Sequence, residues 1–561
     1  LKALCNREDV TLYILLLAAF GVLLHRYTAQ EDILIGSPIS GRDQFEVEGL
    51  IGFFLNTLVL RSKPTRDQSF RQYLHQLRDR VLSGFAHQVI PFEALLQKLQ
   101  IERSLSRTPL FQAMFVLHDA VPPLLRLPDM QADWLEINRG GAMFDLTLVA
   151  RDTDEGLSLT LRYSTDLFDA ATIRQMLRHL QTLLESIVTG PELSIWQLPL
   201  LLATERQQLL VDWNQTQVEH PTDICVQDLF EAQVERTPDA VAVVQADQQL
   251  TYAQLDQRAN QLAHYLQAQG VGPDDLVGLC VERSLEMVVG VLGVLKAGGA
   301  YFPLDPALPH QRLALMLEET TVSLMLTQEH LRSVLPKIEG EILSLDSDWG
   351  RMSAESHQKT RRQVCSNNLA YIVFTSGSTG RPKGVMIQHG SLANYTVFAR
   401  NLFALTPADR VLQFASISFD AAAEEIFPCL ASGARLVLRS DRMLSTVPLF
   451  LDTCSQWGVT VLDLPTAYWH EMVDWLDSES FTFPTSLRLV IIGGDKAERE
   501  KLAKWQEHLG QESRLLNTYG PTEATVVASF ADLSSAPGTG KANREVSIGR
   551  PVDNCKTYVL D

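Results

Sequence analysis

The sequence predicts a multidomain α/β protein. Its 561 residues exceed what one hydrophobic core usually accommodates, and roughly two to four domains are typical of this length. The character of the sequence changes near residue 192, and after residue 224 short apolar strands alternate with helices. Such alternation indicates helices layered on parallel sheets. We therefore expect a first domain at 1–191, an ordered linker at 192–223 and a second domain at 224–561.

The first domain mixes long amphipathic helices with short strands. The apolar run 11–24 predicts a buried core helix, because it is shorter than the roughly 20 residues of a membrane span. It also lacks the basic start and cleavage site of a signal peptide. Residues 70–82 predict a second helix, since apolar side chains recur there at helical spacing: Phe70, Tyr73, Leu74, Leu77, Val81 and Leu82.

Further elements follow from alternating or continuous apolar runs. A helix is predicted at 169–188, ended by Gly190 and Pro191. Strands are predicted in the first domain at 55–60, 112–117 and 157–163, and in the second at 277–281, 300–303, 323–327, 370–375 and 487–492. The run 557–560 is also strand-like. Because the chain starts at Leu1 and stops directly after this run, we expect it to be cut from a larger protein.

Composition excludes some functions. The formal charge of −19 argues against a nucleic-acid partner, which would need a basic face, and no stretch indicates a membrane span. The seven cysteines are scattered without a Cys-x-x-Cys pair, which suits neither a zinc site nor a disulfide framework. This usage predicts a reducing, cytoplasmic location.

The strongest chemical signal is a small-residue loop between two apolar strands, 371–374 and 385–387. Its small residues let backbone N–H groups approach an anion, its hydroxyls can donate to phosphate oxygens, and Lys383 adds positive charge. A triphosphate is the expected guest, and a flexible Ser/Gly loop is the alternative. A Walker A loop is excluded, because Gly-Lys-Ser/Thr is absent. The loop consists of Thr375, Ser376, Gly377, Ser378, Thr379, Gly380, Arg381, Pro382, Lys383 and Gly384.

The loop belongs to a set of blocks that resemble one family. Residues 369–385 (LAYIVFTSGSTGRPKGV) resemble the signature of the acyl-adenylate-forming superfamily. Five more blocks follow in that family's order: 250–266 (LTYAQLDQRANQLAHYL), 295–312 (LKAGGAYFPLDPALPHQR), 419–427 (FDAAAEEIF), 517–526 (NTYGPTEATV) and 548–561 (IGRPVDNCKTYVLD). The resemblance covers about 224–561 and implies the large N-terminal subdomain of an ANL-type adenylation domain.

The resemblance implies ATP-dependent activation of a carboxylate as acyl-AMP, followed by transfer to a thiol. Catalytic roles would fall to Lys383, to Glu523 as Mg²⁺ ligand and to Thr522 at the α-phosphate. On the residues alone, 519–523 could be an ordinary turn. The adenine would be framed by Asn517, Thr518, Tyr519, Gly493, Gly494 and Asp495.

The same resemblance implies an amino-acid substrate, since an Asp at position 420 would pair with the α-ammonium. On the residues alone this Asp could instead cap a helix. Glu424 and Asp463 are two carboxylates in an otherwise small or apolar pocket, which predicts a cationic side chain: lysine, ornithine or arginine. Alternatively, one of them could face solvent or a protein cation. The expected pocket lining is Asp420, Ala421, Glu424, Asp463, Ile491, Gly493, Thr518, Val526 and Val527.

The first domain resembles condensation domains. Residues 51–61 (IGFFLNTLVLR), 87–93 (HQVIPFE) and 103–112 (RSLSRTPLFQ) match blocks of that family in order, and 144–148 fits a later strand. The implied fold is the C-terminal lobe of a chloramphenicol-acetyltransferase-like domain. The family's catalytic HHxxxDG motif is absent from the chain, so the lobe alone should be inactive. His87 is a candidate base, but we expect a structural role at a helix entry.

Together these blocks resemble an elongation module of a non-ribosomal peptide synthetase. The small C-terminal adenylation subdomain and the carrier domain with its phosphopantetheine would lie outside this chain. The implied partners are ATP, an amino acid, and the upstream and downstream carrier domains. A stand-alone acyl- or aryl-acid:CoA ligase and an inactive docking scaffold are the alternatives. A monomeric module is expected by resemblance.

Overall fold

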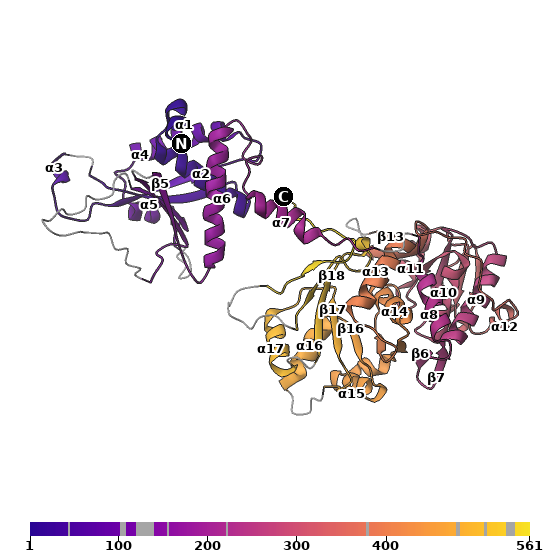
Figure 1. Ribbon diagram of the computed structural model, residues 1–561. Coiled ribbons are helices and arrows are strands. Elements are labelled where there is room, and N and C mark those ends of the chain that lie inside the picture. The colour runs from indigo at the N-terminus through magenta and orange to yellow at the C-terminus, as the bar shows by residue number, and fades with distance from the viewer. Residues whose placement is uncertain are drawn as a thin grey trace. The chain divides into compact units, whose positions relative to one another are not determined.

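A computed structural model describes residues 1–42, 45–100, 108–118, 140–153, 156–219, 223–376, 381–477, 483–509, 513–534 and 545–560. The chain forms two compact units, Leu1–Gln208 and Leu209–Asp561 (Figure 1). The boundary lies within the segment predicted as a linker. That segment contributes α7 (Ala203–Leu210) and the 3₁₀ turn η1 (Asp212–Asn214), and the bounds 192–223 of the ordered linker stay a prediction.

The first unit is built on a five-stranded sheet in the order β2-β1-β3-β4-β5 among its described residues. The central pairs β1/β3 and β3/β4 are parallel, and the outer pairs are antiparallel. The strands are β1 (Ile33–Ile39), β2 (Asn56–Ser62), β3 (Ala113–His118), β4 (Leu146–Thr153) and β5 (Gly156–Tyr163). The helices are α1 (Lys2–Glu8), α2 (Leu12–Thr28), α3 (Phe45–Glu48), α4 (Phe70–Ala86), α5 (Phe92–Leu99) and α6 (Ala170–Thr189).

The predicted core helices of this unit are confirmed. Thr11 begins α2 by accepting a hydrogen bond from the Ile14 N–H, and the helix is buried from Ile14 to His25. A capping box starts α4 at Ser69. The prediction that Leu82 belongs to the apolar face was wrong, because its side chain is 56% exposed.

No single helix in the described ranges is long and apolar enough to cross a membrane. By length and composition alone, the bent pair α1 and α2 would pass the same test. Since most of α2 is buried in the first unit's core, its apolar character is explained by packing.

The second unit contains two sheets whose inner strands run parallel, as predicted, with antiparallel pairs at the edges. One has the order β11-β10-β8-β9-β12-β13, with β8 (Leu276–Cys280), β9 (Ala300–Pro303), β10 (Leu324–Thr327), β11 (Glu341–Ser344), β12 (Leu369–Ser376) and β13 (Pro382–Gln388). The other has the order β20-β19-β18-β17-β16-β14-β15-β6-β7, with β6 (Val241–Gln245), β7 (Gln248–Thr251), β14 (Arg410–Gln413), β15 (Arg435–Leu438), β16 (Val461–Pro465), β17 (Leu489–Gly493), β18 (Arg514–Tyr519), β19 (Ser529–Asp532) and β20 (Arg550–Pro551).

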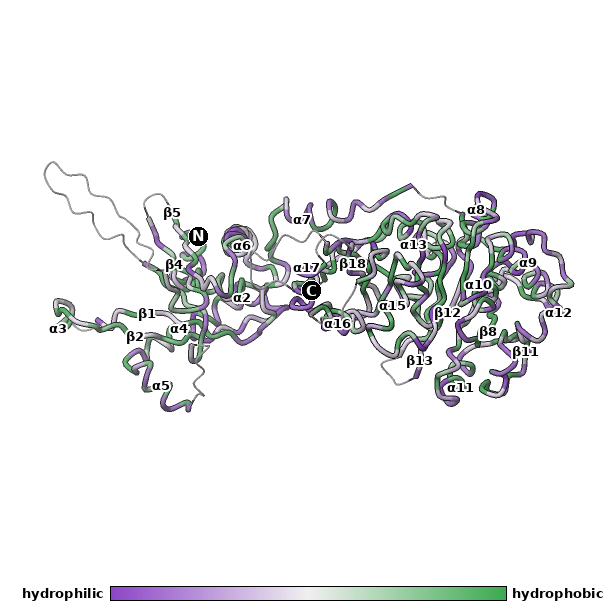
Figure 2. Tube along the Cα trace, turned by 90° about the horizontal axis from the view of Figure 1, so that it is seen from below, coloured by the Kyte–Doolittle hydropathy of each residue, from purple (hydrophilic) through white to green (hydrophobic). Residues whose placement is uncertain are grey.

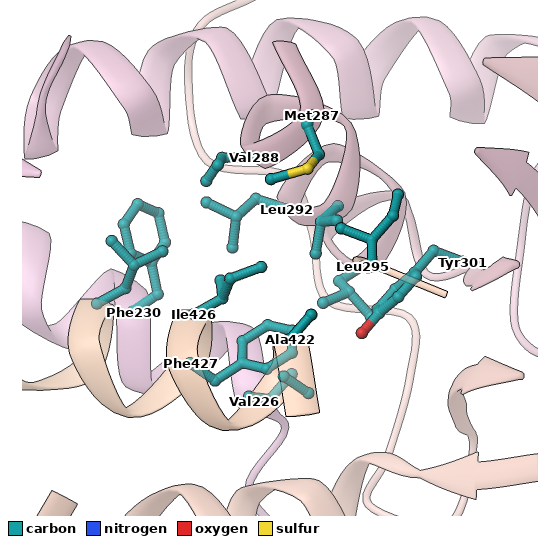
Figure 3. Close-up of a cluster of buried hydrophobic side chains, with 14 of the residues drawn as sticks. Val226, Phe230, Met287, Val288, Leu292, Leu295, Tyr301, Ala422, Ile426 and Phe427 are labelled. Atoms are coloured by element: carbon teal, nitrogen blue, oxygen red, sulfur yellow. The ribbon is translucent and has the colours of Figure 1, made fainter. Parts of the chain in front are cut away.

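Helices join the two sheets into one core. In Figure 3, side chains of α8, α10 and α14 meet Tyr301 of β9 in one buried cluster. Figure 2 shows α10 as a largely hydrophobic segment, in keeping with its burial. The helices are α8 (Val226–Arg236), α9 (Tyr252–Ala268), α10 (Leu285–Ala297), α11 (His310–Glu318), α12 (Trp349–Met352), α13 (His389–Leu402), α14 (Ala421–Ser432), α15 (Val447–Trp457), α16 (Thr466–Asp474) and α17 (Arg499–Leu509).

The end of the chain pairs with residues 214–218, an arrangement we call the clasp. The Asn554 N–H donates to the Thr216 carbonyl at 2.8 Å, and the Thr216 hydroxyl donates to the Cys555 carbonyl at 2.6 Å. The Asn214 side chain bonds both the N–H and the carbonyl of Thr557. The prediction of a strand at 557–560 was wrong, because Thr557 bonds a side chain instead of joining a sheet.

Candidate active site

Strand register places the predicted pocket residues on one face of the larger sheet. Asp463 of β16 lies opposite Ile491 of β17, and Pro465 lies opposite Gly493. Because paired residues of parallel strands share a face, Asp463 lies beside Ile491. Ile491 packs in the core cluster that also contains Ala422 and Ala423 of α14. The face carrying Asp463 is therefore the one covered by α14.

Four carboxyl groups meet there, which we call the acidic cluster: Asp420, Glu424, Glu425 and Asp463. Burial is the main cause that raises the pKa of the Glu424, Glu425 and Asp463 carboxyls, and repulsion by neighbouring carboxylates adds to the rise for Glu424 and Asp463. The Glu424 and Asp463 residues are only 4% and 8% exposed. An acidic cluster so deeply buried strongly favours either protons or a cation as its partner.

Each of the two pocket carboxylates keeps one oxygen without a protein partner. Glu424 Oε1 and Asp463 Oδ2 are buried without a hydrogen bond, and in the described ranges neither residue has an ion pair with Lys, Arg or His. Glu425 differs, since it accepts hydrogen bonds from the N–H groups of Phe414 and Ala415 at 2.9 and 3.0 Å. The alternative that Glu424 or Asp463 serves a protein cation therefore finds no support among the described residues.

Asp420 lies directly before α14, but its side chain makes no capping hydrogen bond. Burial raises the pKa of its carboxyl, while an interaction with the Thr522 hydroxyl opposes the rise. The Glu523 carboxylate is close enough to raise that pKa further. The structure thus brings together Asp420, Thr522 and Glu523, three residues predicted to touch different parts of one substrate complex.

The backbone after Glu523 is strained. Thr525 and Val526 have φ angles of 62° and 70°, in the left-handed region that β-branched residues avoid. The turn is also tight, since a Cβ on Gly520 would lie 2.6 Å from the Val526 carbonyl oxygen. Val526 and Val527 are buried in the core cluster around α14, and their place in the pocket lining stays a prediction. Strain of this kind persists only where the surrounding packing enforces it.

The residues expected around adenine lie at the carboxyl ends of β17 and β18. The Asn517 amide donates to the Ser547 carbonyl at 2.9 Å, and the Thr518 hydroxyl donates to the Ile492 carbonyl at 3.1 Å. Tyr519 is 54% exposed. Gly494, with φ of 83°, and Asp495 follow β17 and are exposed. The carboxyl edge of a parallel sheet is the usual place for a ligand.

The phosphate loop is described only in part. Thr375 and Ser376 end β12, and Thr375 lies opposite Lys383 on β13. Lys383 is exposed and lines a hollow of about 920 Å³ with Asp274 and Glu319, and that hollow does not include Glu523. The predicted contacts of Gly377, Ser378, Thr379 and Gly380 lie outside the described residues, as does the first half of the predicted condensation block 103–112.

A larger cavity of about 1110 Å³ lies beside Glu523, and none of the four residues of the acidic cluster lines it. Glu523, Thr525, Val527 and Tyr395 are among its lining residues. The Tyr395 side chain, on α13, interacts with the Glu424 carboxylate. Sequence reasoning missed Tyr395, because its role depends on α13 packing against α14. It also missed Glu425, although the adjacent Glu424 was a signal.

The residues present fit Mg²⁺ held by substrate. Glu523 is exposed on the 3₁₀ turn η5 (Thr522–Ala524). Among the described residues, no group of three or more His, Cys, Asp or Glu side chains could hold a metal by itself. Mg²⁺ commonly takes one or two carboxylates and completes its shell with substrate phosphates and water. A single exposed carboxylate is therefore an adequate protein ligand.

His87 occupies a different position from the one predicted. It lies at the C-terminal end of α4 rather than at a helix entry, and its Nδ1 is 2.8 Å from the Ser83 carbonyl oxygen. The hydrogen bond ties the ring to the last turn of the helix.

Comparisons with known proteins give the family. The family model described as AMP-binding enzyme matches residues 230–561, and the condensation domain model matches residues 1–210. A linear gramicidin synthase protein from Brevibacillus parabrevis is 43% identical over all of this chain, which spans 7% of that protein. Bacitracin synthase 3 from Bacillus licheniformis is 37% identical, again over all of this chain and 9% of that protein.

A solved structure shows the same fold. A variant of the non-ribosomal peptide synthetase FmoA3, bound to α-methyl-L-serine-AMP, has a TM-score of 0.84 and 25% identity, covering 99% of this chain and 62% of that one. The two α/β units with mainly parallel inner strands agree with this likeness. The chain belongs to the AMP-binding enzyme family and carries a condensation domain segment ahead of that domain, as the peptide synthetases do.

Proposed function

We propose that the second unit activates an amino acid with a cationic side chain as its aminoacyl-AMP, within an elongation module of a non-ribosomal peptide synthetase. The observation that carries the proposal is the buried acidic cluster, in which Glu424 and Asp463 each keep an oxygen without a partner. An ammonium or guanidinium group would supply the missing charge and hydrogen bonds. Lysine, ornithine and arginine satisfy this requirement.

The main-chain end of the substrate would lie at Asp420. Its carboxylate would hold the α-ammonium, and the Thr522 hydroxyl beside it would contact the α-phosphate. One substrate carboxylate oxygen attacks the α-phosphorus of ATP, an acyl–phosphate anhydride bond forms, and the bond to pyrophosphate breaks. Lys383 and the phosphate loop would hold the departing phosphates. Mg²⁺ bound at Glu523 would neutralise phosphate charge.

Several findings support amino-acid activation over the alternatives. The related FmoA3 structure holds α-methyl-L-serine-AMP. Asp420 is positioned beside Thr522 and Glu523, which suits an amino acid better than a fatty or aryl acid. The condensation domain segment supports transfer to the phosphopantetheine thiol of a carrier domain rather than to free CoA. All seven cysteines are free, which supports a reducing, cytoplasmic setting.

Amino-acid-dependent ATP–pyrophosphate exchange tests the proposal, measured on the chain within its complete natural protein. Exchange should be led by lysine, ornithine or arginine. Exchange led by an apolar or acidic amino acid would keep the reaction and overturn the substrate. Adenylation of an aryl or fatty acid, with free CoA as the acceptor, would support the ligase alternative instead.

A further inference from the structure

Tyr395 is a buried titratable group to which the proposed reaction gives no task. It lies in the first half of α13, is 3% exposed, and interacts with the Glu424 carboxylate. Asp463 and Asp420 are also near enough to raise the pKa of its phenol. It therefore faces the part of the acidic cluster that would receive the substrate's side chain.

The surroundings of Glu424 contain few positive charges. Arg283 is close to Glu425 and partly opposes the rise that burial causes in the pKa of that carboxyl. The Glu425 carboxylate is also bonded by two backbone N–H groups and by the Gln413 amide. Among the described residues, the titratable and charged groups that interact with the cluster or belong to it are Asp420, Glu424, Glu425, Asp463, Tyr395, Glu523, Tyr301, Tyr371, Cys429 and Arg283.

This environment decides the state of the empty pocket. Two buried carboxylates with unpartnered oxygens cannot both remain ionised without a cation. Burial raises the pKa of the Glu424 carboxyl to about 8, and interaction with Tyr395 opposes that rise. Without substrate, the pair therefore holds at least one proton at neutral pH. A substrate ammonium that enters the pocket must displace that proton.

We propose that the Glu424–Asp463 pair exchanges its proton for the cationic side chain of the substrate, and that Tyr395 is the positioning residue that controls this exchange. The proton leaves a carboxylic acid O–H for solvent as the substrate's ammonium takes its place, and no covalent bond changes. The inference rests on the proposed function, and it adds that selectivity for a cationic side chain depends on pH. A neutral side chain of similar length displaces no proton.

The sign of the effect follows from the direction of the pKa shift. Below about pH 8 the Glu424 carboxyl is protonated, and the affinity of the pocket for a cation is lowered. The side-chain ammonium of lysine stays charged through this range, because its pKa is near 10.4. The Michaelis constant for lysine should therefore fall as the pH rises toward 8. The constant for norleucine, which shares the α-amino and carboxyl groups, should not show this fall.

The experiment compares lysine and norleucine in pyrophosphate exchange across this pH range, using the complete protein. The ratio of the two Michaelis constants cancels effects on ATP and on Asp420. Tyr395→Phe removes the hydroxyl that stabilises the Glu424 carboxylate. The pH range in which the Michaelis constant for lysine falls should therefore move to higher pH. A shift of one pKa unit would raise the lysine constant about tenfold at neutral pH and leave norleucine within about twofold. The control is Tyr252→Phe, which loses a buried hydrogen bond to the Ala434 carbonyl outside the cluster.

Calorimetry of lysine binding in two buffers of different ionisation enthalpy independently measures the number of protons released on binding. The wild type should release up to about one proton per lysine at neutral pH and none with norleucine. The inference would be overturned, and the proposed function would stand, if lysine were preferred but the ratio of the two Michaelis constants did not change with pH and no proton were released. If Tyr395→Phe raised the Michaelis constants of lysine and norleucine by the same factor, Tyr395 would have only a structural role. Absence of any preference for basic amino acids at every pH would instead overturn the proposed function.

Discussion

Gly493 shows how a single missing side chain can shape the proposed pocket. It ends β17 beside Thr518, and a Cβ there would lie 2.7 Å from the Thr518 hydroxyl oxygen. We expect Gly493→Ala to displace Thr518, weaken its hydrogen bond to Ile492, and destabilise the second unit by about 1–3 kcal/mol. Exchange should slow at the same time. Thermal unfolding and exchange kinetics check this.

Gly350→Ala is the matched control for that variant, since a Cβ there meets no atom within 4 Å. A loss of the same size in both variants would show that close approach at position 493 is unimportant.

The acidic cluster should also make stability depend on pH. Because burial raises the pKa of the Glu424 carboxyl in the folded state, the folded protein binds more protons than the unfolded chain between the two pKa values. The free energy of unfolding therefore falls as the pH rises from about 5 to 8, by up to about 1.4 kcal/mol per pKa unit. Glu424→Gln should reduce this fall, which thermal unfolding at several pH values would show.

An exposed carboxyl provides the comparison. Glu318→Gln, on α11, should leave the pH dependence of the melting temperature as in the wild type. If Glu424→Gln gives the same profile as Glu318→Gln, the buried carboxyl does not govern this dependence.

At the scale of single residues the site stays a prediction, and what the sequence could not show about it has physical causes. Asp420, Glu424 and Asp463 could be predicted because the sequence can be matched to the family residue by residue. In the structure, strand register brings Asp463 beside Ile491. Tyr395 could not be found, since no local pattern reveals that α13 faces the acidic cluster. Lys383 was identified by its loop, yet it lines a hollow that does not include Glu523. Side-chain direction in such a segment is set by tertiary contacts.

At the scale of elements, apolar periodicity predicted the buried helix α2 and the inner strands correctly. Periodicity failed in the clasp, where side chains, and not a neighbouring strand, make hydrogen bonds to the backbone. Asn214 and Asn554 stand in segments without periodicity, and each bonds a backbone far away in the sequence. The run 557–560 is apolar enough to suggest a strand, but Val559 is 99% exposed and Thr557 bonds to Asn214.

The clasp leads to a prediction about local opening. The Asn554 side chain accepts from the Val218 N–H at 3.0 Å and donates to Asn394 on α13 at 2.8 Å. We expect Asn554→Ala to speed amide hydrogen exchange at Val218 and Thr557 without unfolding the unit, because local opening costs less than global unfolding. The exposed Asn401→Ala, also on α13, should leave these amides unchanged. Unchanged exchange in Asn554→Ala would mean that backbone bonds alone hold the segment.

The hydrophobic clusters of the described residues are separate, and each draws on one unit alone. The core around α2 and α4 draws only on the first unit, whereas the core around α10 and α14 draws only on the second. We therefore expect calorimetry to resolve two unfolding transitions. Leu77→Ala, at a site 1% exposed, should lower the first unit's transition by about 2–5 kcal/mol.

Asp409→Asn should move only the other transition. Asp409 is 3% exposed and accepts from Arg488 at 2.7 and 2.9 Å, so its replacement weakens charge-assisted hydrogen bonds to a partly exposed cation and costs about 1.5–3 kcal/mol. The pKa of Asp409 is lowered in the folded state, so its contribution is present above its unfolded pKa and disappears as the pH falls through the folded value. If either variant shifted both transitions equally, the units would not unfold independently.

The clasp also determines where this protein can be recombined with another. Residues 214–218 precede the first helix of the AMP-binding domain, yet their hydrogen-bond partners lie at 554–557. A hybrid that takes over foreign sequence from residue 224 onward would pair one protein's Asn214 and Thr216 with another protein's closing segment. A junction at the unit boundary after Gln208 would transfer both halves together. Recombinants joined at that point should keep their native fit, whereas those joined a few residues later would depend on whether two unrelated sequences happen to match.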